Sequence, residues 1–292
     1  MKRTRFRFVS SVLASAVFSA TFAFAYPPAD GSGGGGLLEQ VHEAASVGHH
    51  ALTYTDARHA MFSFTDNTEW EGRRGVLEAY SEIFVEGRSP EGGDYPERGD
   101  QNQDGVVDSA GMNTEHVWPQ SFFDRHLPMR SDLHHLLPTF NSINSIRDRN
   151  PFGPSAGPYR NTAGARCCDN GFEPPDSAKG RVARAMFYFY TRYQGEGILP
   201  EDFIEPFWNS RIEIFLAWNR AFPPTEFEAE RNRRVQEVQG NRNPFVDDPG
   251  LADRIGVAGF WMGGGRFADA GGRVLASYSL ALDYPSAVFA GL

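Results

Sequence analysis

One stretch of the chain, from Gly111 to Gly153, constrains the fold more than any other segment. It contains four of the eight histidines, an adjacent Glu115-His116 pair and a polar segment with helical spacing. Glu115 and Asn144 are 144 − 115 = 29 positions apart, so a strand, a loop and then a helix can bring them together. We therefore expect the chemistry of this protein to lie where a short strand meets a helix.

The second half of this stretch predicts the helix. Thr139 or Asn141 can cap its start, and it runs to about Arg149 because Pro151 disfavours helical backbone in the residue before it. Two faces follow at helical spacing, an apolar one with Phe140, Ile143 and Ile146 and a polar one with Asn141, Asn144, Ser145 and Asp148. The polar face is available to a functional site, while the apolar face packs into the core.

The first residues have the pattern of an export signal. Four basic residues precede an apolar run that ends at Ala23-Phe24-Ala25, which predicts a secretory signal peptide over residues 1–25. A membrane anchor is the alternative, but serines and alanines weaken the apolar run. A Pro/Gly-rich linker over 26–36, a domain over 37–249 and an extension of unknown role over 250–292 follow. We expect a secreted or periplasmic protein with no membrane contact after cleavage and no obligate protein partner.

Charge limits the classes of partner. Removing the signal takes away four positive charges, so the formal net charge moves from −9 to −9 − 4 = −13. Proteins that coat nucleic acid without specificity are usually basic, so this balance disfavours that class. Arginine supplies nearly all the positive charge, since the only lysines are Lys2 and Lys179, and its planar fork suits phosphate. A local arginine-lined cleft remains compatible with the composition.

Elsewhere the pattern predicts a mostly helical chain with a few short strands. Helices are expected at Leu37–His50, from an Asp176 cap to Tyr193, at Phe207–Ala221, and from a Thr225/Glu228 capping box to Gly240. Strands are expected at Ala60–Phe64 and Val76–Tyr80, with Ile83–Val85 extending the second strand. These elements predict an α+β domain.

An acidic loop precedes the central stretch. Oxygen side chains at its positions 1, 3, 5 and 9 match the front of a calcium loop, with Asp100, Asn102, Asp104 and Asp108 as the candidate ligands of a structural Ca²⁺. The bidentate acid expected at position 12 is missing, because Gly111 stands there. Clusters of Asp, Asn and Gly also form ordinary turns without an ion, so both interpretations stay open.

The central residue types suit phosphodiester hydrolysis. That reaction needs an activated water, stabilisation of growing negative charge and a proton for the departing oxygen, and one divalent ion can supply the last two. A hard ion such as Mg²⁺ takes a few oxygen ligands, and Glu115 with the amide oxygen of Asn144 is such a pair. In a regular strand Glu115 and His116 point to opposite faces, so sharing one site needs a bend or a metal at the strand edge.

Several ordered segments carry a family resemblance. They are Asn113–Ser121 (NTEHVWPQS), Asp132–Thr139 (DLHHLLPT), Asn144-x-x-Arg147, Phe172–Gly180, Ala183–Tyr188 and Gln239–Phe245. Together they resemble the bacterial endonuclease I family over roughly Leu38 to Pro249. The resemblance implies an exported, metal-dependent, non-specific nuclease acting on DNA and also RNA. It implies a ββα-metal core, a short hairpin plus a metal-site helix, embedded in a mostly helical single domain.

The resemblance also implies roles for individual residues. His116 matches the general base of the family, and Glu115 and Asn144 match its magnesium ligands, with Mn²⁺ or Ca²⁺ as substitutes for Mg²⁺. A water on the metal would then protonate the 3′ oxygen and leave 5′-phosphate ends. The catalytic arginine of the family has no aligned counterpart, so Arg125, Arg130 and Arg147 are all candidates.

Other residues receive supporting roles. We expect His134, His135, Asp132 and Asn141 to orient the groups that act, and Arg242 and Arg184 to line a groove for the phosphate backbone. Well-studied periplasmic members of the family contain several disulfides, whereas this chain has only the adjacent Cys167 and Cys168. A vicinal disulfide and two free thiols are both compatible with that pair.

Two other functions compete with the nuclease hypothesis. The first is a zinc hydrolase built on His126, His134 and His135, although the zincin spacing His-Glu-x-x-His is missing. The second is a non-catalytic, calcium-stabilised extracellular binding domain built around Asp100–Asp108.

Overall fold

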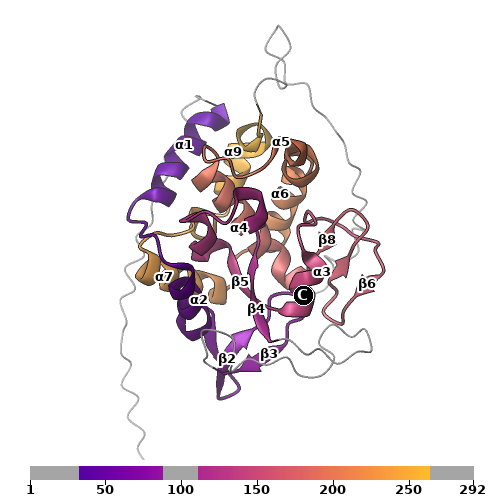
Figure 1. The fold of residues 1–292 in the computed structure, drawn as a ribbon. Helices are drawn as coiled ribbons and strands as arrows, with labels where there is room; N and C mark the ends of the chain where they lie inside the picture. Colours follow the sequence, from indigo (N-terminus) through magenta and orange to yellow (C-terminus); the bar gives the residue numbers. More distant parts are fainter. Residues whose placement is uncertain (1–32, 88–110, 264–292) are drawn as a thin grey trace, which may run out of the picture.

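The computed structural model describes residues 33–87 and 111–263 of the chain (Figure 1). The signal peptide, the candidate calcium loop and most of the C-terminal extension lie outside these residues. Helices occupy Gly33–Ser46 (α1), Tyr54–Ala60 (α2), Asn141–Arg147 (α3), Asp176–Tyr193 (α4), Glu201–Phe203 (α5), Ile212–Ala221 (α6), Glu226–Gln239 (α7), Pro244–Asp247 (α8) and Gly250–Phe260 (α9). Three small antiparallel sheets complete a mixed, mostly helical architecture, which confirms the predicted α+β class.

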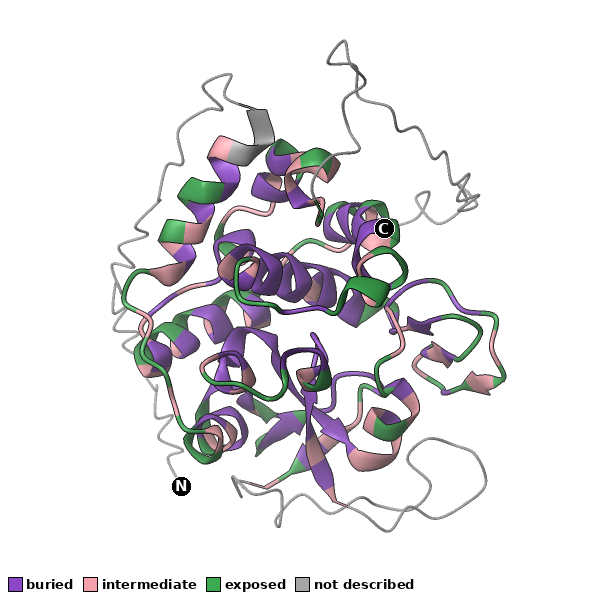
Figure 2. Cartoon of the chain, turned by 45° about the horizontal axis from the view of Figure 1, so that its top comes forward, coloured by how far each residue is buried: buried purple, intermediate pink, exposed green. Residues whose placement is uncertain are grey.

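The long helix α4 forms the centre of the core (Figure 2). Fourteen of the 18 residues of α4 are buried, and α6 and α1 pack against it. Its aromatic side chains stack on rings from distant segments: Phe189 on Trp118, Tyr190 on Trp208, and Phe187 on Phe260. Such pairs bury large apolar areas with defined geometry, so α4 fixes the position of the elements around it.

A two-stranded sheet and a helix stand next to this core. Strand β4 (Met112–His116) pairs antiparallel with β5 (Leu136–Phe140), in a register that sets Glu115 opposite Leu137. Helix α3 follows β5 without a linker and contacts both strands. Every residue of β5 is buried, as expected for an apolar strand covered on both faces. The unit is therefore a buried antiparallel pair followed by a short helix.

A second sheet is tied to this unit through a buried carboxylate. Strands β1 (Asn67–Trp70), β2 (Arg73–Leu77) and β3 (Phe84–Glu86) are antiparallel neighbours. Just beyond β2, Oε1 of Glu78 accepts hydrogen bonds from the Thr139 hydroxyl and the Phe140 amide, at 2.6 and 3.2 Å. The amide of Ala79 donates to the Pro138 carbonyl oxygen. These bonds fix the end of β5 where α3 begins.

The third sheet, of β6 (Tyr159–Arg160), β7 (Arg166–Cys167) and β8 (Phe172–Glu173), lies beside α3 in Figure 1. Cys167 and Cys168 form a vicinal disulfide, which decides between the two states that the sequence left open. Their sulfurs lie 3.8 and 3.7 Å from Nδ2 of Asn150, just beyond the end of α3.

One predicted strand and one predicted strand extension were wrong. Met61–Thr65 is a π-helix (η1) that continues α2, and the Ser63 hydroxyl donates to the carbonyl oxygen of His59 four residues earlier. The segment is held by helical bonds and by the burial of Met61 and Phe62. The segment at Ile83–Val85 does not extend β2 but turns back to pair with it as β3.

Several boundaries also differ from the predictions. Helix α1 begins at Gly33, inside the expected linker, because packing of its apolar residues against α4 and α9 stabilises it despite the low helix propensity of glycine. Pro175, not Asp176, is the N-cap residue of α4. The helix expected at Phe207–Ala221 is divided into η5 (Ile204–Trp208), η6 (Asn209–Arg211) and α6.

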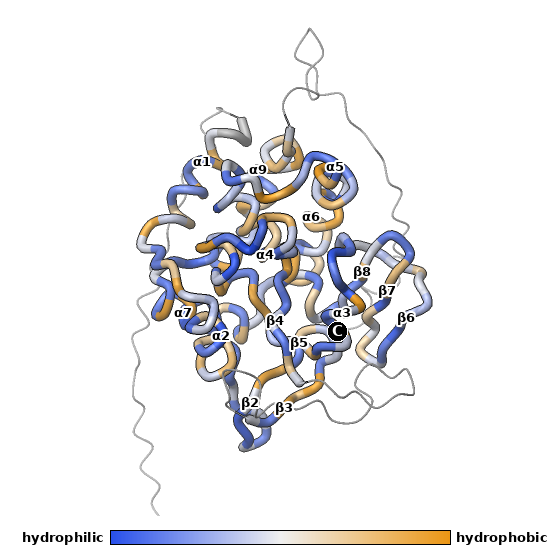
Figure 3. The backbone as a smooth tube through the Cα atoms, viewed as in Figure 1, coloured by the Kyte–Doolittle hydropathy of each residue, from blue (hydrophilic) through white to orange (hydrophobic). Residues whose placement is uncertain are grey.

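Other local signals were confirmed. The Thr225 hydroxyl accepts the Glu228 amide at the start of α7, and Gly240 ends that helix in a left-handed conformation with φ 91°. In the described part of the chain, no helix is both long and apolar enough to span a membrane. Figure 3 agrees, since hydrophobic and hydrophilic residues alternate along the helices.

Candidate active site

Strand β4 carries the two residues at the centre of the site. Glu115 and His116 occupy its last two positions, and their exposed fractions are 1 % and 5 %. Because side chains alternate along a strand, Glu115 contacts Tyr80 and Arg147, whereas His116 contacts the backbone of Arg130. The two side chains therefore have different partners although they are adjacent in sequence.

Glu115 is held by one of its two carboxylate oxygens. Oε1 accepts a hydrogen bond of 3.0 Å from the Tyr80 hydroxyl and lies 3.3 Å from Nε of Arg147. Burial raises the pKa of Glu115 to about 7, against the opposing effect of Arg147 and Tyr80. Among the described residues, Oε2 has no hydrogen-bond partner. A buried carboxylate with one fixed and one uncommitted oxygen suits a cation ligand, since a bound cation favours the ionised form.

Helix α3 brings Asn144 to the same strand. Its Nδ2 lies 3.4 Å from the carbonyl oxygen of Thr114, the residue before Glu115, and Oδ1 is uncommitted among the described residues. Asn141 supports this placement, because its Oδ1 accepts a hydrogen bond of 2.8 Å from Nδ2 of Asn113 on β4. The donor set of one carboxylate and one amide oxygen fits a hard cation.

His116 has its proton position fixed by the main chain. Its Nε2 lies 3.0 Å from the carbonyl oxygen of Arg130, and a carbonyl can only accept, so Nε2 carries the proton and Nδ1 presents a lone pair. Nδ1 has no hydrogen-bond partner among the described residues. Burial, and next the neighbouring His135, lower the pKa of His116 well below its usual range. The ring is therefore neutral at neutral pH and can accept a proton at Nδ1.

The structure separates the arginine candidates. Arg147 is 1 % exposed and donates to the carbonyl oxygens of His116, Val117 and Asp148, so its guanidinium is occupied in joining α3 to β4. Arg130 is half-buried, and only its Nε is hydrogen-bonded, to Oε1 of Gln120 at 3.0 Å. Its two terminal nitrogens have no partner in the described chain. Of Arg130 and Arg147, only Arg130 has terminal nitrogens that no described residue binds, and Arg125, the third candidate, is exposed.

Three residues of the site escaped the sequence analysis as functional groups. Tyr80 binds Glu115, Gln120 binds Arg130, and the Tyr54 ring contacts both Arg130 and His116. Only Gln120 carried a signal, since it belongs to the conspicuous Asn113–Ser121 segment.

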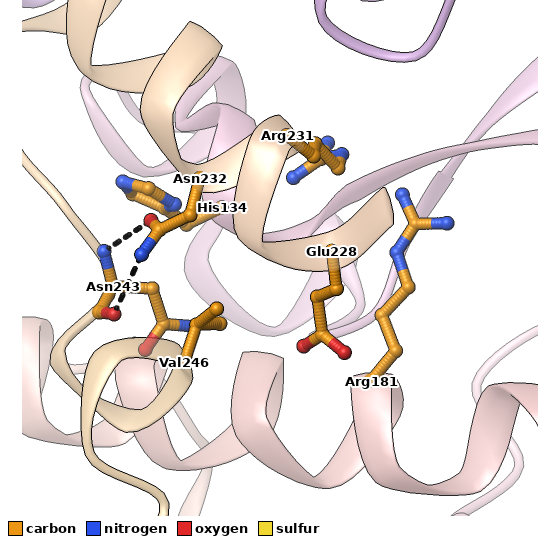
Figure 4. A pocket seen from close by; sticks show the side chains of 7 residues that line it. All are labelled: His134, Arg181, Glu228, Arg231, Asn232, Asn243 and Val246. Carbon is orange, nitrogen blue, oxygen red and sulfur yellow. Dashed lines mark hydrogen bonds between the residues drawn. The ribbon is translucent and has the colours of Figure 1, made fainter. Parts of the chain in front are cut away.

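His134 and His135 are buried in the short helix η4 (Leu133–His135) and point to the core. Nε2 of His134 lies 3.1 Å from the Asn241 carbonyl oxygen, and Nε2 of His135 lies 2.7 Å from that of Met129. His134 lines a small polar cavity shown in Figure 4, together with Arg181, Glu228, Arg231, Asn232, Asn243 and Val246. Burial lowers the pKa of each histidine to about 4.

Asp132 anchors this buried region. Its carboxylate accepts hydrogen bonds from the hydroxyls of Tyr188 and Tyr193, from Nε2 of Gln239 and from the His134 amide. Asp132 thus orders the loop before β5. It shares no contact with the Glu115 carboxylate among the hydrogen bonds and ion pairs of the described residues.

The zinc hypothesis finds no cluster to support it. His126 is exposed, while His134 and His135 are buried and bound to separate carbonyl groups. Within residues 33–87 and 111–263, no group of three or more His, Cys, Asp or Glu side chains could hold a metal ion. The structure therefore does not assemble the three-histidine site.

The two arginines expected in a phosphate groove are engaged elsewhere. Arg184 is 1 % exposed, and its guanidinium binds both carboxylate oxygens of Glu228, at 2.7 and 2.5 Å. Arg242 is half-buried and bidentate to Asp247. An interior ion pair leaves Arg184 unable to contact a substrate, while Arg242 would have to exchange its carboxylate partner for a phosphate.

Comparison with known proteins adds independent information. Residues 38–250 match the family model described as Endonuclease I. The chain is 30 % identical over 241 residues to an extracellular ribonuclease of Bacillus subtilis, covering 79 % of this chain and 77 % of that protein. It is 30 % identical over 129 residues to an extracellular deoxyribonuclease of Aeromonas hydrophila, covering 42 % of this chain and 52 % of that protein. An Endonuclease-1 of Buchnera aphidicola is 32 % identical over 127 residues, covering 40 % and 45 % of the two chains.

Proposed function

The chain belongs to the endonuclease I family of nucleases, and on this premise we propose that it is an exported, metal-dependent endonuclease that hydrolyses the phosphodiester bonds of RNA and DNA. The relatives named as extracellular ribonuclease and deoxyribonuclease support both export and the two substrates. RNA is a stronger candidate substrate than the sequence alone indicated, because the similarity to the ribonuclease extends over most of both chains.

Glu115 and Asn144 are the residues that would hold the metal. Each has an oxygen that no described residue binds, and both lie where α3 meets β4. When bound, a hard cation such as Mg²⁺, or Mn²⁺ in its place, supplies stabilisation of negative charge on the phosphate and an acidic water for the departing oxygen. Tyr80 and Arg147 keep the carboxylate oriented through its other oxygen.

His116 would act as the general base. Its free Nδ1 accepts the proton of the attacking water, and the Arg130 carbonyl oxygen, which already holds Nε2–H, stabilises the positive charge that the ring gains. The lowered pKa keeps the imidazole unprotonated before the reaction. This hydrogen bond between Nε2 and the main chain is the observation that carries the proposed mechanism.

Arg130 would contact the phosphate. Its terminal nitrogens are uncommitted among the described residues, and its own carbonyl group positions the base, so both functions arise at one place in the chain. A guanidinium binds phosphate oxygens without reading base edges. The enzyme would therefore cut with little sequence preference and, by protonation of the 3′ oxygen, leave 5′-phosphate ends.

Cleavage of a supercoiled plasmid and of a structureless RNA tests the proposal. Wild-type protein should cut both substrates with Mg²⁺ and lose activity in EDTA. His116→Ala should lower turnover by about 10²- to 10⁴-fold, the usual contribution of a positioned general base, at an unchanged melting temperature. His126→Ala is the matched control, because the His126 side chain is exposed and has no hydrogen bond or ion pair among the described residues. Wild-type turnover in His116→Ala would remove the proposed base.

A further inference from the structure

We propose that Tyr54 is a positioning residue of this nuclease, which acts by holding the Arg130 guanidinium where its terminal nitrogens face the phosphate. The inference rests on the proposed function, because it assigns Tyr54 a role in the step that Arg130 would stabilise. It concerns an element, α2, that ends 111 − 60 = 51 positions before the central stretch begins.

The first argument is the anchoring of α2. Tyr54 is the first residue of this helix, and the preceding Thr53 caps it by accepting the Asp56 amide at 3.1 Å. One turn later, Nε of Arg58 donates to the Thr114 hydroxyl on β4 at 3.2 Å, and Ala57 is fully buried. The helix is therefore docked on the strand that carries Glu115, which holds the Tyr54 backbone at a fixed place beside the site.

The second argument is the contact between Tyr54 and Arg130. The guanidinium carbon of Arg130 lies 4.1 Å from the centre of the Tyr54 ring, which is the distance of a stacked cation–π pair. Gln120 accepts the Nε proton from another direction. A flat ring on the guanidinium face and an acceptor at Nε restrain a side chain that is otherwise flexible. The terminal nitrogens are the part of Arg130 that these two contacts leave available.

The third argument is the proximity to the base. The rings of Tyr54 and His116 have centroids 5.6 Å apart with an interplanar angle of 30°. Arg130 binds His116 through its carbonyl oxygen and Tyr54 through its guanidinium. The three residues therefore form one contact group, in which Tyr54 supplies no proton or charge. Its contribution is the orientation of its partners, above all Arg130.

A double-mutant cycle tests this role. Turnover and KM are measured for wild type, Tyr54→Leu, Arg130→Ala and the double variant, on a short fluorescent single-stranded oligonucleotide with saturating Mg²⁺. Tyr54→Leu should lower kcat by about tenfold, the order expected from loss of one cation–π contact, and leave KM nearly unchanged. In the Arg130→Ala background the same substitution should have almost no further effect, because the group that Tyr54 positions is gone.

Two more variants separate positioning from simple packing. Tyr54→Phe retains the ring face and should keep most of the wild-type kcat, whereas Tyr54→Met, a second variant without a flat ring, should repeat the loss seen in Tyr54→Leu. Melting temperatures identify any variant that is partly unfolded. If Tyr54→Leu and Tyr54→Met both unfold, equal kcat for Tyr54→Phe and wild type still supports the ring contact, and a tenfold loss in Tyr54→Phe overturns it.

Other outcomes overturn the proposal while the nuclease function stands. Additive losses in the cycle would show that Tyr54 does not act through Arg130. A raised KM with unchanged kcat would show that Tyr54 stacks directly on a base of the substrate. Failure of the proposed function looks different, because wild-type protein would then cut no nucleic acid with any divalent ion and the cycle would have no starting rate.

Discussion

Nε of Arg147 lies 3.3 Å from Oε1 of Glu115, and neither residue is more than 1 % exposed. The other nitrogens of this arginine donate to main-chain carbonyl groups at the end of β4 and at the end of α3. Arg147 thus compensates a buried negative charge and joins the helix to the strand. Its role in the structure is to preserve the shape of the site, and that role yields the first prediction.

Arg147→Met should destabilise the protein strongly. Removing one partner of a buried ion pair leaves the other charge uncompensated, which costs about 3–5 kcal/mol. Urea unfolding followed by circular dichroism measures this free energy of unfolding. Arg220→Met is the control, because Arg220 pairs with Asp253 at an exposed position and its loss should cost less than about 1 kcal/mol. A stable Arg147→Met protein that has lost only turnover would instead identify Arg147 as the phosphate ligand.

Arg130→Ala should show the opposite combination of effects. We expect kcat to fall by about 10²- to 10³-fold, the usual loss when one donor to a developing charge is removed, with little change in melting temperature. Plasmid cleavage and differential scanning fluorimetry on the same preparation measure the two quantities. Arg220→Ala should match wild type in both. Full activity in Arg130→Ala would show that another positively charged side chain contacts the phosphate.

Metal binding should depend on Glu115 and Asn144. Loss of groups that merely orient a ligand costs about 10- to 100-fold in affinity, so Glu115→Gln and Asn144→Ala should each weaken Mn²⁺ binding by at least that factor. Isothermal titration calorimetry reads binding without reference to turnover. Ser145→Ala, an exposed change on the same helix, should bind Mn²⁺ as wild type does. Unchanged affinity in both ligand variants would place the cation elsewhere.

Acid should destabilise the fold through its buried histidines. His134 and His135 have pKa values lowered to about 4, so between pH 6.5 and 4 the unfolded chain binds protons that the folded protein excludes. Protonation then favours unfolding, and the melting temperature should fall as the pH is lowered through this window. The His135 ring packs against the rings of Phe123 and Phe189, so a phenylalanine suits this position. The His135→Phe variant should therefore show a smaller fall in melting temperature. His126→Phe should keep the wild-type dependence, and an unchanged slope in His135→Phe would contradict the assignment.

The sequence predicted the strand and the helix that carry the candidate site because their determinants are local. Glu115, His116 and Asn144 lie within 30 positions, in segments whose spacing indicates a strand and a helix. The helix boundaries follow from the same signals, and the observed α3 ends two residues before the predicted Arg149. Here local propensity and tertiary packing agree, which is the condition for a reliable inference from sequence.

The remaining features depend on contacts that local patterns do not encode. The sequence does not distinguish Arg130, Arg147 and Arg184 from one another. Packing leaves Arg130 half-buried near His116 and buries Arg147 and Arg184 in ion pairs. Tyr54 reaches His116 across 62 positions, from a helix that the sequence analysis did not detect. The π-helical segment Met61–Thr65 shows the same limit, since the sequence predicted a strand at Ala60–Phe64.

The partner of the His116 imidazole is a main-chain oxygen, and this has a consequence for evolution and for engineering. Every amino acid supplies a carbonyl group, so replacing residue 130 changes the cation without removing the acceptor that holds Nε2–H. The proposed base and the proposed phosphate contact can therefore vary independently although both depend on residue 130. A library randomised at position 130 could search for new substrate preferences in an enzyme that retains its proton acceptor.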